Sequence, residues 1–312
     1  MKLAFFDDFK LGVIKGDKVV DVSKVVTDIP HTGPHDLLNG LIERFDSYRG
    51  KLEAVAAKED GVALASVRLR PPVPRPVNID CMAVNYMEDG TRKEPAPINA
   101  FHKSPMTIIG PGETMVLPDV PASVFEGEAE FAVIIGKRAH NVTAADAMDY
   151  VFGYCNFIDG SARGLPPSGN TFYQMKSRET FAPIGPWLVT ADEIKDPMHL
   201  QVRLWNNGDL MQNFNTSDMA HDIAKSIAFV SSIHTLMPGD ILATGTNHRG
   251  LHAFQDGDRI ALEVEGCGRL EITVKDDLKR KWPRETRLQR QEKGQEALAR
   301  QISGKHAPAE TG

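Results

Sequence analysis

The chain has 312 residues, of which 41% are hydrophobic and 25% are charged, and its formal net charge at pH 7 is -6. This length is enough for one large folded core or two modest ones, and the composition is ordinary for a globular protein. The negative net charge argues against nucleic acid as a partner, and the lack of a long apolar segment argues against a membrane-spanning protein.

The N-terminal segment combines short strands with a helical pattern. Apolar and polar residues alternate in a way that predicts strands over residues 3–6, 12–15 and 18–22. From about Asp36 to Val55, apolar residues recur at helical spacing, which predicts one helix over this stretch. We therefore expect a small unit of mixed α and β structure at the start of the chain.

A proline-rich run follows this unit. Residues 71–76 read Pro-Pro-Val-Pro-Arg-Pro, and such a run continues neither a helix nor a central strand. It predicts a linker over residues 71–77, with a small N-terminal accessory domain over residues 1–70.

After the linker the pattern is mostly β. Helices are predicted over residues 143–150 and from a cap at Ser217, and strands over residues 241–244, 259–265 and 269–274, the last two as an antiparallel pair. Because strands do not alternate regularly with helices, a doubly wound fold is disfavoured. The class we expect is α+β and predominantly β.

The C-terminal region is charged and poor in apolar residues. We expect a tail over residues 277–312, in which residues 288–302 form a solvated or partner-packing helix and about the last ten residues are disordered.

The cysteines and the first residues of the chain give an expectation for the cellular compartment. Cys81, Cys155 and Cys267 are scattered, which argues against a disulfide scaffold or a zinc cluster and favours a reducing cytoplasm. The apolar run after Met1 is too short for a signal peptide.

An acidic strand is the first feature that indicates chemistry. Glu126, Glu128 and Glu130 alternate along a predicted strand, so their side chains point to one face. Carboxylates this close repel one another unless a proton, a basic partner or a metal ion neutralises them. Mg²⁺ or Mn²⁺ suits an all-oxygen site, whereas the alternative is an edge strand with hydrated acids.

Further polar groups lie where strands end. Asp159 follows an apolar stretch and could complete a site of three carboxylates with Glu128 and Glu130. Lys176 comes soon after, and residues 244–246, Thr-Gly-Thr, can present hydroxyls and backbone amides to a ligand.

Over residues 78 to about 275, the order of these motifs resembles the fumarylacetoacetate hydrolase superfamily. The resemblance is carried by Asn85-Tyr86, Phe101–Pro105, Ile109–Gly112, Glu128–Lys137, Tyr150–Tyr154, Asp159 with Ser161–Arg163, Thr180–Trp187, Asn215–Met219, Pro238–Asp240 and Thr244–Thr246. It implies a catalytic domain over residues 78–276 with a mixed β-sandwich roll. It also implies a homodimer, with Mg²⁺ or Mn²⁺ held by a Glu-x-Glu pair and an Asp.

Carried over to this sequence, the resemblance makes Glu128, Glu130 and Asp159 the metal ligands. Glu126 is then a bystander, solvated or beside the ligands. Lys176 matches a lysine that approaches the metal and the substrate. Two further residues, Arg163 and Thr246, match positions near the bound ligand, although Arg163 equally suits a structural partner of the acidic residues.

One departure affects the general base. Hydrolytic members carry an Asn-Tyr-x-x-His pattern, and here Asp89 stands in the histidine position after Asn85-Tyr86. An aspartate with an ordinary pKa near ~4 is a weak base at neutral pH unless burial raises that pKa. Glu88 and Glu94 share the same loop, which has the composition of a lid.

The candidate residues around the substrate follow from this loop and from the Thr-Gly-Thr rim. We expect Asp89, Glu94 and Lys176 to be catalytic, and the residues expected to bind substrate are Tyr86, Arg163, Thr246 and His248. His248, together with His102, is also an alternative base. Two other histidines, His221 and His234, are expected to be structural.

The resemblance implies hydrolysis of a C–C bond in a small 2,4-dioxo acid or 1,3-diketone, in the catabolism of an aromatic compound or sugar acid. The substrate would be the oxo acid itself, with no nucleic acid or membrane partner. A metal-dependent decarboxylase or keto–enol tautomerase is the first alternative, because neither reaction needs an attacking water. A catalytically inactive, ligand-binding member is the second.

Overall fold

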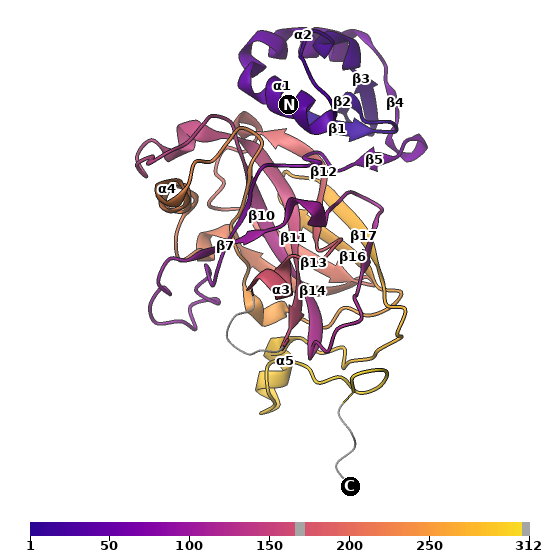
Figure 1. The fold of residues 1–312 in the computed structure, drawn as a ribbon, viewed down its shortest axis with the longest axis vertical. Coiled ribbons are helices and arrows are strands. Elements are labelled where there is room, and N and C mark those ends of the chain that lie inside the picture. Colours follow the sequence, from indigo (N-terminus) through magenta and orange to yellow (C-terminus); the bar gives the residue numbers. More distant parts are fainter. Residues whose placement is uncertain (166–171, 308–312) are drawn as a thin grey trace.

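The computed structural model describes residues 1–165 and 172–307, and the strands of this part form two sheets (Figure 1). The larger sheet has 12 strands, ten of them in the order β4-β3-β2-β1-β12-β11-β10-β15-β6-β7, with β5 pairing β1 and β8 pairing β12. Its strands are β1 (Lys2–Phe6), β2 (Lys10–Lys15), β3 (Lys18–Asp21), β4 (Val62–Ala63), β5 (Leu69–Arg70), β6 (Ile79–Met82), β7 (Ala100–Lys103), β8 (Ile108–Ile109), β10 (Val124–Ile135), β11 (Val151–Arg163), β12 (Ala182–Thr190) and β15 (Ile241–Ala243).

The smaller sheet has five strands in the order β14-β13-β16-β17-β9. These are β9 (Thr114–Val116), β13 (Gln201–Asn206), β14 (Asp209–Asn215), β16 (Arg259–Val264) and β17 (Arg269–Lys275). The α-helices of the described part are α1 (Pro34–Glu43), α2 (Phe45–Lys58), α3 (Phe172–Lys176), α4 (Ile223–Ile233) and α5 (Arg287–Glu292). The predominantly β fold expected from the sequence is confirmed.

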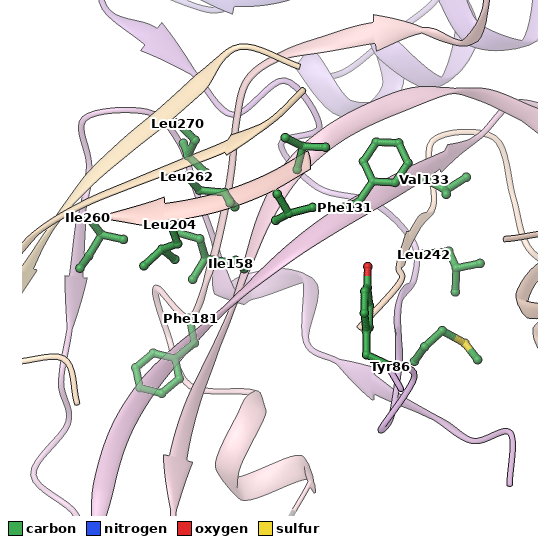
Figure 2. Packing of buried hydrophobic residues seen from close by; sticks show 14 of the residues in the cluster. Tyr86, Phe131, Val133, Ile158, Phe181, Leu204, Leu242, Ile260, Leu262 and Leu270 are labelled. Carbon is green, nitrogen blue, oxygen red and sulfur yellow. The ribbon is translucent and has the colours of Figure 1, made fainter. Parts of the chain in front are cut away.

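The main core lies between the two sheets. Figure 2 shows Leu204, Leu262 and Leu270 of the smaller sheet grouped with Ile158 of β11, and Phe131 of β10 belongs to the same cluster. At ~1.5–3 kcal/mol for each large apolar side chain removed from water, this cluster is a major stabilising contribution. Strands β10 and β11 are buried along almost their whole length at the centre of the molecule.

Strand β10 has two different faces along its length. Residues Phe131 and Val133 point into the core between the sheets, whereas Ala132 and Ile134 pack in a second cluster that contains residues of α1 and α2. The first half of this second face carries the glutamates instead of apolar residues. The acidic residues therefore occupy one section of an otherwise apolar strand.

The N-terminal segment is joined to the larger sheet. Strand β1 pairs antiparallel with β12, with Leu3 opposite Leu188, and Val73 of the proline-rich run is buried in the second cluster. In Figure 1 this segment forms the lobe at the top of the molecule. That residues 1–70 form a separate accessory domain stays a prediction. In the structure this segment shares the larger sheet and the second core cluster with the rest of the chain.

The prediction of one continuous N-terminal helix is wrong, because the structure has two helices there. Arg44 has φ -117° and ψ 17°, which ends α1, and α2 begins at Phe45. The turn brings the Phe45 ring edge-on to Phe152 at 4.9 Å between centroids. Packing against β11 outweighs the continuous helical spacing of the sequence.

Three other predicted helices differ from the structure. Residues 143–150 contain only a 3₁₀ turn at Ala147–Tyr150, and before it the Thr143 hydroxyl donates to the Asp146 side chain at 2.7 Å. Helix α4 is capped by Asp222, whose side chain accepts from the Lys225 amide, and not by Ser217. The C-terminal helix is confined to α5.

The C-terminal tail is partly ordered. Lys305 and His306 both contact Asp119, so the described part of the last ten residues is attached to the body of the protein. Residues 308–312 of the expected disordered end lie outside the described residues. Within residues 1–165 and 172–307, no helix is long and apolar enough to cross a membrane.

Candidate metal centre and active site

Three carboxylates from β10 and β11 form a buried cluster. Glu128 and Glu130 lie two residues apart on β10, and Asp159 of β11 is the cross-strand neighbour of Glu128. One oxygen of each side chain lies within 4.8 Å of the others, and all three residues are buried. The alternative of hydrated acids on an edge strand is therefore wrong.

Two buried lysines supply positive charge at this cluster. The Lys176 ammonium at the end of α3 donates to Glu128 Oε1 at 2.7 Å and also to Asp159. The Lys103 ammonium of β7 donates to the other oxygen of Asp159 at 2.6 Å and to the Gly160 carbonyl oxygen at 3.1 Å. Asp159 is thereby held from both sides, and Lys176 lies between two of the three carboxylates.

Glu126 is occupied by arginines. Arg163 Nε donates to Glu126 Oε2 at 3.0 Å, and Arg287 Nε of α5 donates to Glu126 Oε1 at 3.0 Å. Arg163 also contacts Glu128. Glu126 is 2% exposed, so a solvated role is wrong, and its two ion pairs place it beside the cluster without a free oxygen edge. Arg163 is a structural partner of the acidic residues in this arrangement.

The charges divide unequally among the carboxylates. Burial raises the pKa of Glu130 well above its ordinary range, and the neighbouring Asp159 and Glu128 carboxylates add to this effect. Burial acts in the same direction on Glu128, but the Lys176 ammonium and the Arg163 guanidinium outweigh it and hold the pKa of Glu128 well below its ordinary range. Glu130 has the weaker positive surroundings, since the one hydrogen bond that its carboxylate accepts from the described residues comes from the Gly245 amide at 2.8 Å.

These residues fit a hard divalent cation. The donor set is entirely carboxylate oxygen, it is buried, and its members are close enough to share one ion. The position of the Lys176 ammonium between Glu128 and Asp159 also marks this point as one where the fold places positive charge. Mg²⁺ or Mn²⁺ therefore matches the chemistry of Glu128, Glu130 and Asp159.

The loop after β6 turns Glu88 inward and Asp89 outward. Both residues have a left-handed backbone, with φ of 56° and 54°, which is a strained arrangement for residues other than glycine. The Glu88 carboxylate accepts from the His248 amide at 2.8 Å and contacts the His248 ring at Nδ1, 2.6 Å away. The Asp89 side chain is 49% exposed and pairs with Arg249 at 3.1 Å. The acid buried behind this loop is thus Glu88, not Asp89.

A polar pocket of about 380 Å³ lies under this loop. Its lining includes Glu88 and His248 together with three arginines, Arg92, Arg249 and Arg287. It adjoins the metal cluster, because Arg287, which lines the pocket, binds Glu126 on the same strand face as Glu128. A larger groove of about 1130 Å³ lies along β3 and the end of α2, away from the three carboxylates.

Other predicted site residues lie in different surroundings. Tyr86 is 0% exposed in the core, edge-on to Phe214 at 5.0 Å, and Figure 2 shows it among the core residues. The Thr246 hydroxyl donates to the Ala129 carbonyl oxygen at 2.7 Å and accepts from Gln212 at 2.9 Å. It thus positions the strand segment between Glu128 and Glu130. Glu94 is exposed and is not among the residues that line the described pocket.

Sequence reasoning did not single out Lys103, Glu88 as a partner of His248, or Arg287. Lys103 lies within the conspicuous stretch Phe101–Pro105, and strand alternation in β7 separates it from its exposed neighbour His102. Arg287 reaches Glu126 across 161 residues of sequence, so no local pattern could indicate the contact.

The comparisons with known proteins agree with this geometry. The model of the fumarylacetoacetate (FAA) hydrolase C-terminal family matches residues 78–275. A maleylpyruvate hydrolase of Aquipseudomonas alcaligenes is 33% identical over 291 residues, covering 88% of this chain and 99% of that protein. An oxaloacetate tautomerase of Bacillus subtilis is 32% identical over 284 residues, covering 84% of this chain and 94% of that protein.

A solved structure gives the same fold with a metal ion. The crystal structure of maleylpyruvate hydrolase from Sphingobium sp. SYK-6, in complex with manganese(II) and pyruvate, is 38% identical to this chain. Its TM-score is 0.80, and the match covers 88% of this chain and 99% of that one.

Proposed function

Because the chain belongs to the fumarylacetoacetate hydrolase family, we propose that it is a divalent-metal-dependent hydrolase that cleaves a C–C bond in an acylpyruvate, a 2,4-dioxo acid. The observation that carries this proposal is the buried set Glu128, Glu130 and Asp159 with Lys176 among them. The resemblance to maleylpyruvate hydrolases along nearly the whole chain supports it.

The metal and the lysine have complementary roles in this proposal. When bound by Glu128, Glu130 and Asp159, Mg²⁺ or Mn²⁺ supplies a Lewis acid that polarises an oxo group of the substrate. The Lys176 ammonium stays protonated, since Asp159 and Glu128 raise the pKa of Lys176 although burial opposes this. It therefore offsets the negative charge that develops on a neighbouring substrate oxygen.

The general base is the pair Glu88 and His248. A carboxylate only accepts hydrogen bonds, so the 2.6 Å contact requires Nδ1–H on His248 and leaves Nε2 as the acceptor of a neutral ring. Asp89, the residue at the family's histidine position, is exposed and paired with Arg249, which does not suit a base. The histidine missing from one rim of the pocket is thus replaced by His248 from the other.

In this proposal, His248 moves the proton that the hydrolysis requires. His248 Nε2 takes a proton from water while the water oxygen attacks the distal carbonyl carbon. The bond between that carbon and the methylene breaks, and the electron pair stays on the methylene as an enolate beside Lys176. Return of the proton from His248 to this carbon yields pyruvate and a second carboxylic acid.

The pocket favours a substrate with a second carboxylate. Arg92, Arg249 and Arg287 all line it, and Arg92 Nε is a buried donor with no hydrogen-bond partner in the described part of the chain. Guanidinium groups bind carboxylates through charge-assisted hydrogen bonds. A dicarboxylic acylpyruvate such as maleylpyruvate has the matching chemistry.

An oxaloacetate tautomerase or decarboxylase on the same scaffold is the second candidate. Asp89 in place of histidine favours it, since neither reaction needs an activated water, and relatives from rat and Bacillus subtilis are named oxaloacetate tautomerases. A catalytically inactive, ligand-binding member is the third.

We also propose that the protein is a cytoplasmic homodimer acting in catabolism. The family resemblance supports the dimer. The three cysteines, Cys81, Cys155 and Cys267, are free and buried, which supports a reducing compartment.

The test is product analysis with a panel of substrates. Maleylpyruvate, a monocarboxylic acylpyruvate and oxaloacetate are incubated with Mn²⁺, with and without a chelator, and followed by ¹³C NMR. We expect pyruvate and maleate in equal amounts, only with metal. Release of carbon dioxide, or a change of enol content without cleavage, would favour the second candidate, and no turnover of any substrate would favour the third.

A further inference from the structure

A second cluster of metal-ligand residues lies on the edge of the larger sheet. Asp80 of β6, His102 of β7 and His234 at the end of α4 each offer one ligand atom, and these atoms lie within 4.8 Å of one another. His234 Nε2 is 3.0 Å from Asp80 Oδ1, and His102 Nε2 is 3.5 Å from the same oxygen. We propose that these three residues form a second, non-catalytic metal site for an ion such as Zn²⁺ or Co²⁺.

This cluster is separate from the catalytic carboxylates. Asp80 and His102 are cross-strand neighbours on β6 and β7, the strand at one end of the sheet order. The next residue, Lys103, points to the opposite face and binds Asp159 there. Figure 1 shows α4 and β7 on the same side of the molecule, where His234 follows α4.

An unpartnered oxygen is the first sign that a ligand is missing. The Asp80 side chain is 3% exposed, and its Oδ2 is a buried atom with no hydrogen-bond partner in the described part of the chain. Buried carboxylate oxygens in folded proteins are nearly always bonded to a donor or a cation. Burial raises the pKa of Asp80, and the Asp240 carboxylate acts in the same direction, whereas His234 and His102 oppose both.

The tautomer of His234 is the second sign. Its Nδ1 lies 3.1 Å from the Thr235 carbonyl oxygen, a contact that needs Nδ1–H. In the neutral ring Nε2 then carries a lone pair, and it faces Asp80 Oδ1, another acceptor, at 3.0 Å. A proton or a cation must lie between them. A backbone carbonyl bound to the outer ring nitrogen is also how metal-binding histidines are usually oriented.

The distances and the donor types select the ion. Zn²⁺ binds imidazole nitrogen and carboxylate oxygen at ~2.0–2.2 Å, which puts neighbouring tetrahedral ligands ~3.3 Å apart. The separations of His234 Nε2 and His102 Nε2 from Asp80 Oδ1, 3.0 and 3.5 Å, bracket that value. Two imidazoles favour Zn²⁺ or Co²⁺ over Mg²⁺. Since His102 is 59% exposed, water can complete the coordination.

The experiment uses the different preferences of the two sites. The full chain is saturated with Mg²⁺ to fill the all-oxygen site, then titrated with Zn²⁺ by calorimetry and with Co²⁺ by visible absorption. We expect one ion per chain and the intense absorption of tetrahedral cobalt. His102 is exposed, so His102→Ala should leave the core intact. It should weaken Zn²⁺ binding by ~10–100-fold or more. His234→Ala should do the same.

The matched control is His199→Ala. His199 is an exposed histidine that contacts one carboxylate, Asp196, at 2.7 Å but has no place in the cluster, so its loss should leave binding unchanged. Asp159→Asn should also retain this second ion. The proposal is overturned if wild-type protein binds no Zn²⁺ under saturating Mg²⁺, which would mean that a proton joins His234 and Asp80. It is equally overturned if His102→Ala and His234→Ala bind Zn²⁺ as tightly as the wild type.

Discussion

Four acids on β10 and β11 show how neighbouring residues acquire different roles. Glu126, Glu128 and Glu130 share one face of β10, yet Glu126 is neutralised by Arg163 and Arg287, whereas Glu128 and Glu130 join Asp159. Strand alternation predicted the shared face, and the family resemblance predicted Glu128 and Glu130 as the ligands on it. The sequence also offered Arg163 as a structural partner of the acidic residues, but it could not indicate Arg287, which lies 161 residues from Glu126.

The base assignment gives the first prediction. His248→Ala and Glu88→Gln should each lower kcat by ~10²–10⁴-fold, the usual contribution of a general base, and leave Mn²⁺ affinity unchanged. Asp89→Asn is the matched control and should stay within about fivefold of the wild type, because an exposed ion pair contributes less than ~1 kcal/mol. A large loss for Asp89→Asn with little loss for His248→Ala would move the base to Asp89.

Substrate recognition gives a prediction at the same scale. Arg92→Gln should lower kcat/KM for a dicarboxylic acylpyruvate by ~10–100-fold, since a hydrogen bond to a charged group is worth ~1.5–3 kcal/mol. The change for a monocarboxylic analogue should be small. Lys93→Gln, on the same loop but exposed, is the control. Equal losses for both substrates would show that Arg92 does not read the distal carboxylate.

At the scale of elements, the strand pair β10 and β11 decides the geometry of the metal centre. Gly127 and Gly160 face each other between the Glu126–Ser161 and Glu128–Asp159 pairs. A Cβ at Gly127 would lie 2.3 Å from the Phe254 ring, so the close approach of that ring requires glycine. The periodicity of the sequence predicted the acidic strand β10, but it carried no information about Phe254.

This close approach is testable by substitution. Gly127→Ala should destabilise the protein by ~1–3 kcal/mol in urea unfolding and weaken Mn²⁺ binding, because the overpacked ring must displace β10. Adding Phe254→Leu to Gly127→Ala should recover part of the lost stability. A double-mutant cycle measures this coupling between the two positions. Gly50→Ala, in α2 with open space around it, should instead stabilise by ~0.5–1 kcal/mol. Additive effects of Gly127→Ala and Phe254→Leu would contradict the contact.

At the scale of the whole molecule, the site is assembled from the full length of the chain. Glu88 and Lys103 precede the carboxylates, and His248 and Arg287 follow them. The tail, expected to contain a solvated or partner-packing helix, contributes to the wall of the pocket through Arg287. Local patterns predicted seven of the strands, β1, β2, β3, β10, β15, β16 and β17. The break at Arg44 and the position of the tail depend on packing between distant segments and could not be predicted.

The stability of the whole fold should depend on pH through His252. Burial lowers the pKa of His252 to about 4, below its ordinary value of 6.5, and Asn206 donates to its Nε2 at 3.0 Å. Between these values the unfolded chain binds a proton that the folded chain does not, so stability rises with pH across this window and is lost as pH falls through it. The full contribution of this pKa difference to the free energy of unfolding is ~3 kcal/mol.

Comparison with a variant isolates this contribution. Urea unfolding of wild type and His252→Gln between pH 4 and 7 should give a shallower pH dependence for the variant, whatever its absolute stability. Parallel curves would mean that the pKa of His252 does not differ between the folded and the unfolded chain.

The central claim is that Glu128, Glu130 and Asp159 hold the divalent ion on which C–C cleavage depends. It is tested most directly by measuring pyruvate release from maleylpyruvate against Mn²⁺ concentration for the wild type and Asp159→Asn, with circular dichroism to check the fold. We predict a saturable, chelator-sensitive rate in the wild type and none in a folded Asp159→Asn. An unchanged rate or unchanged Mn²⁺ dependence in the folded variant would contradict the account.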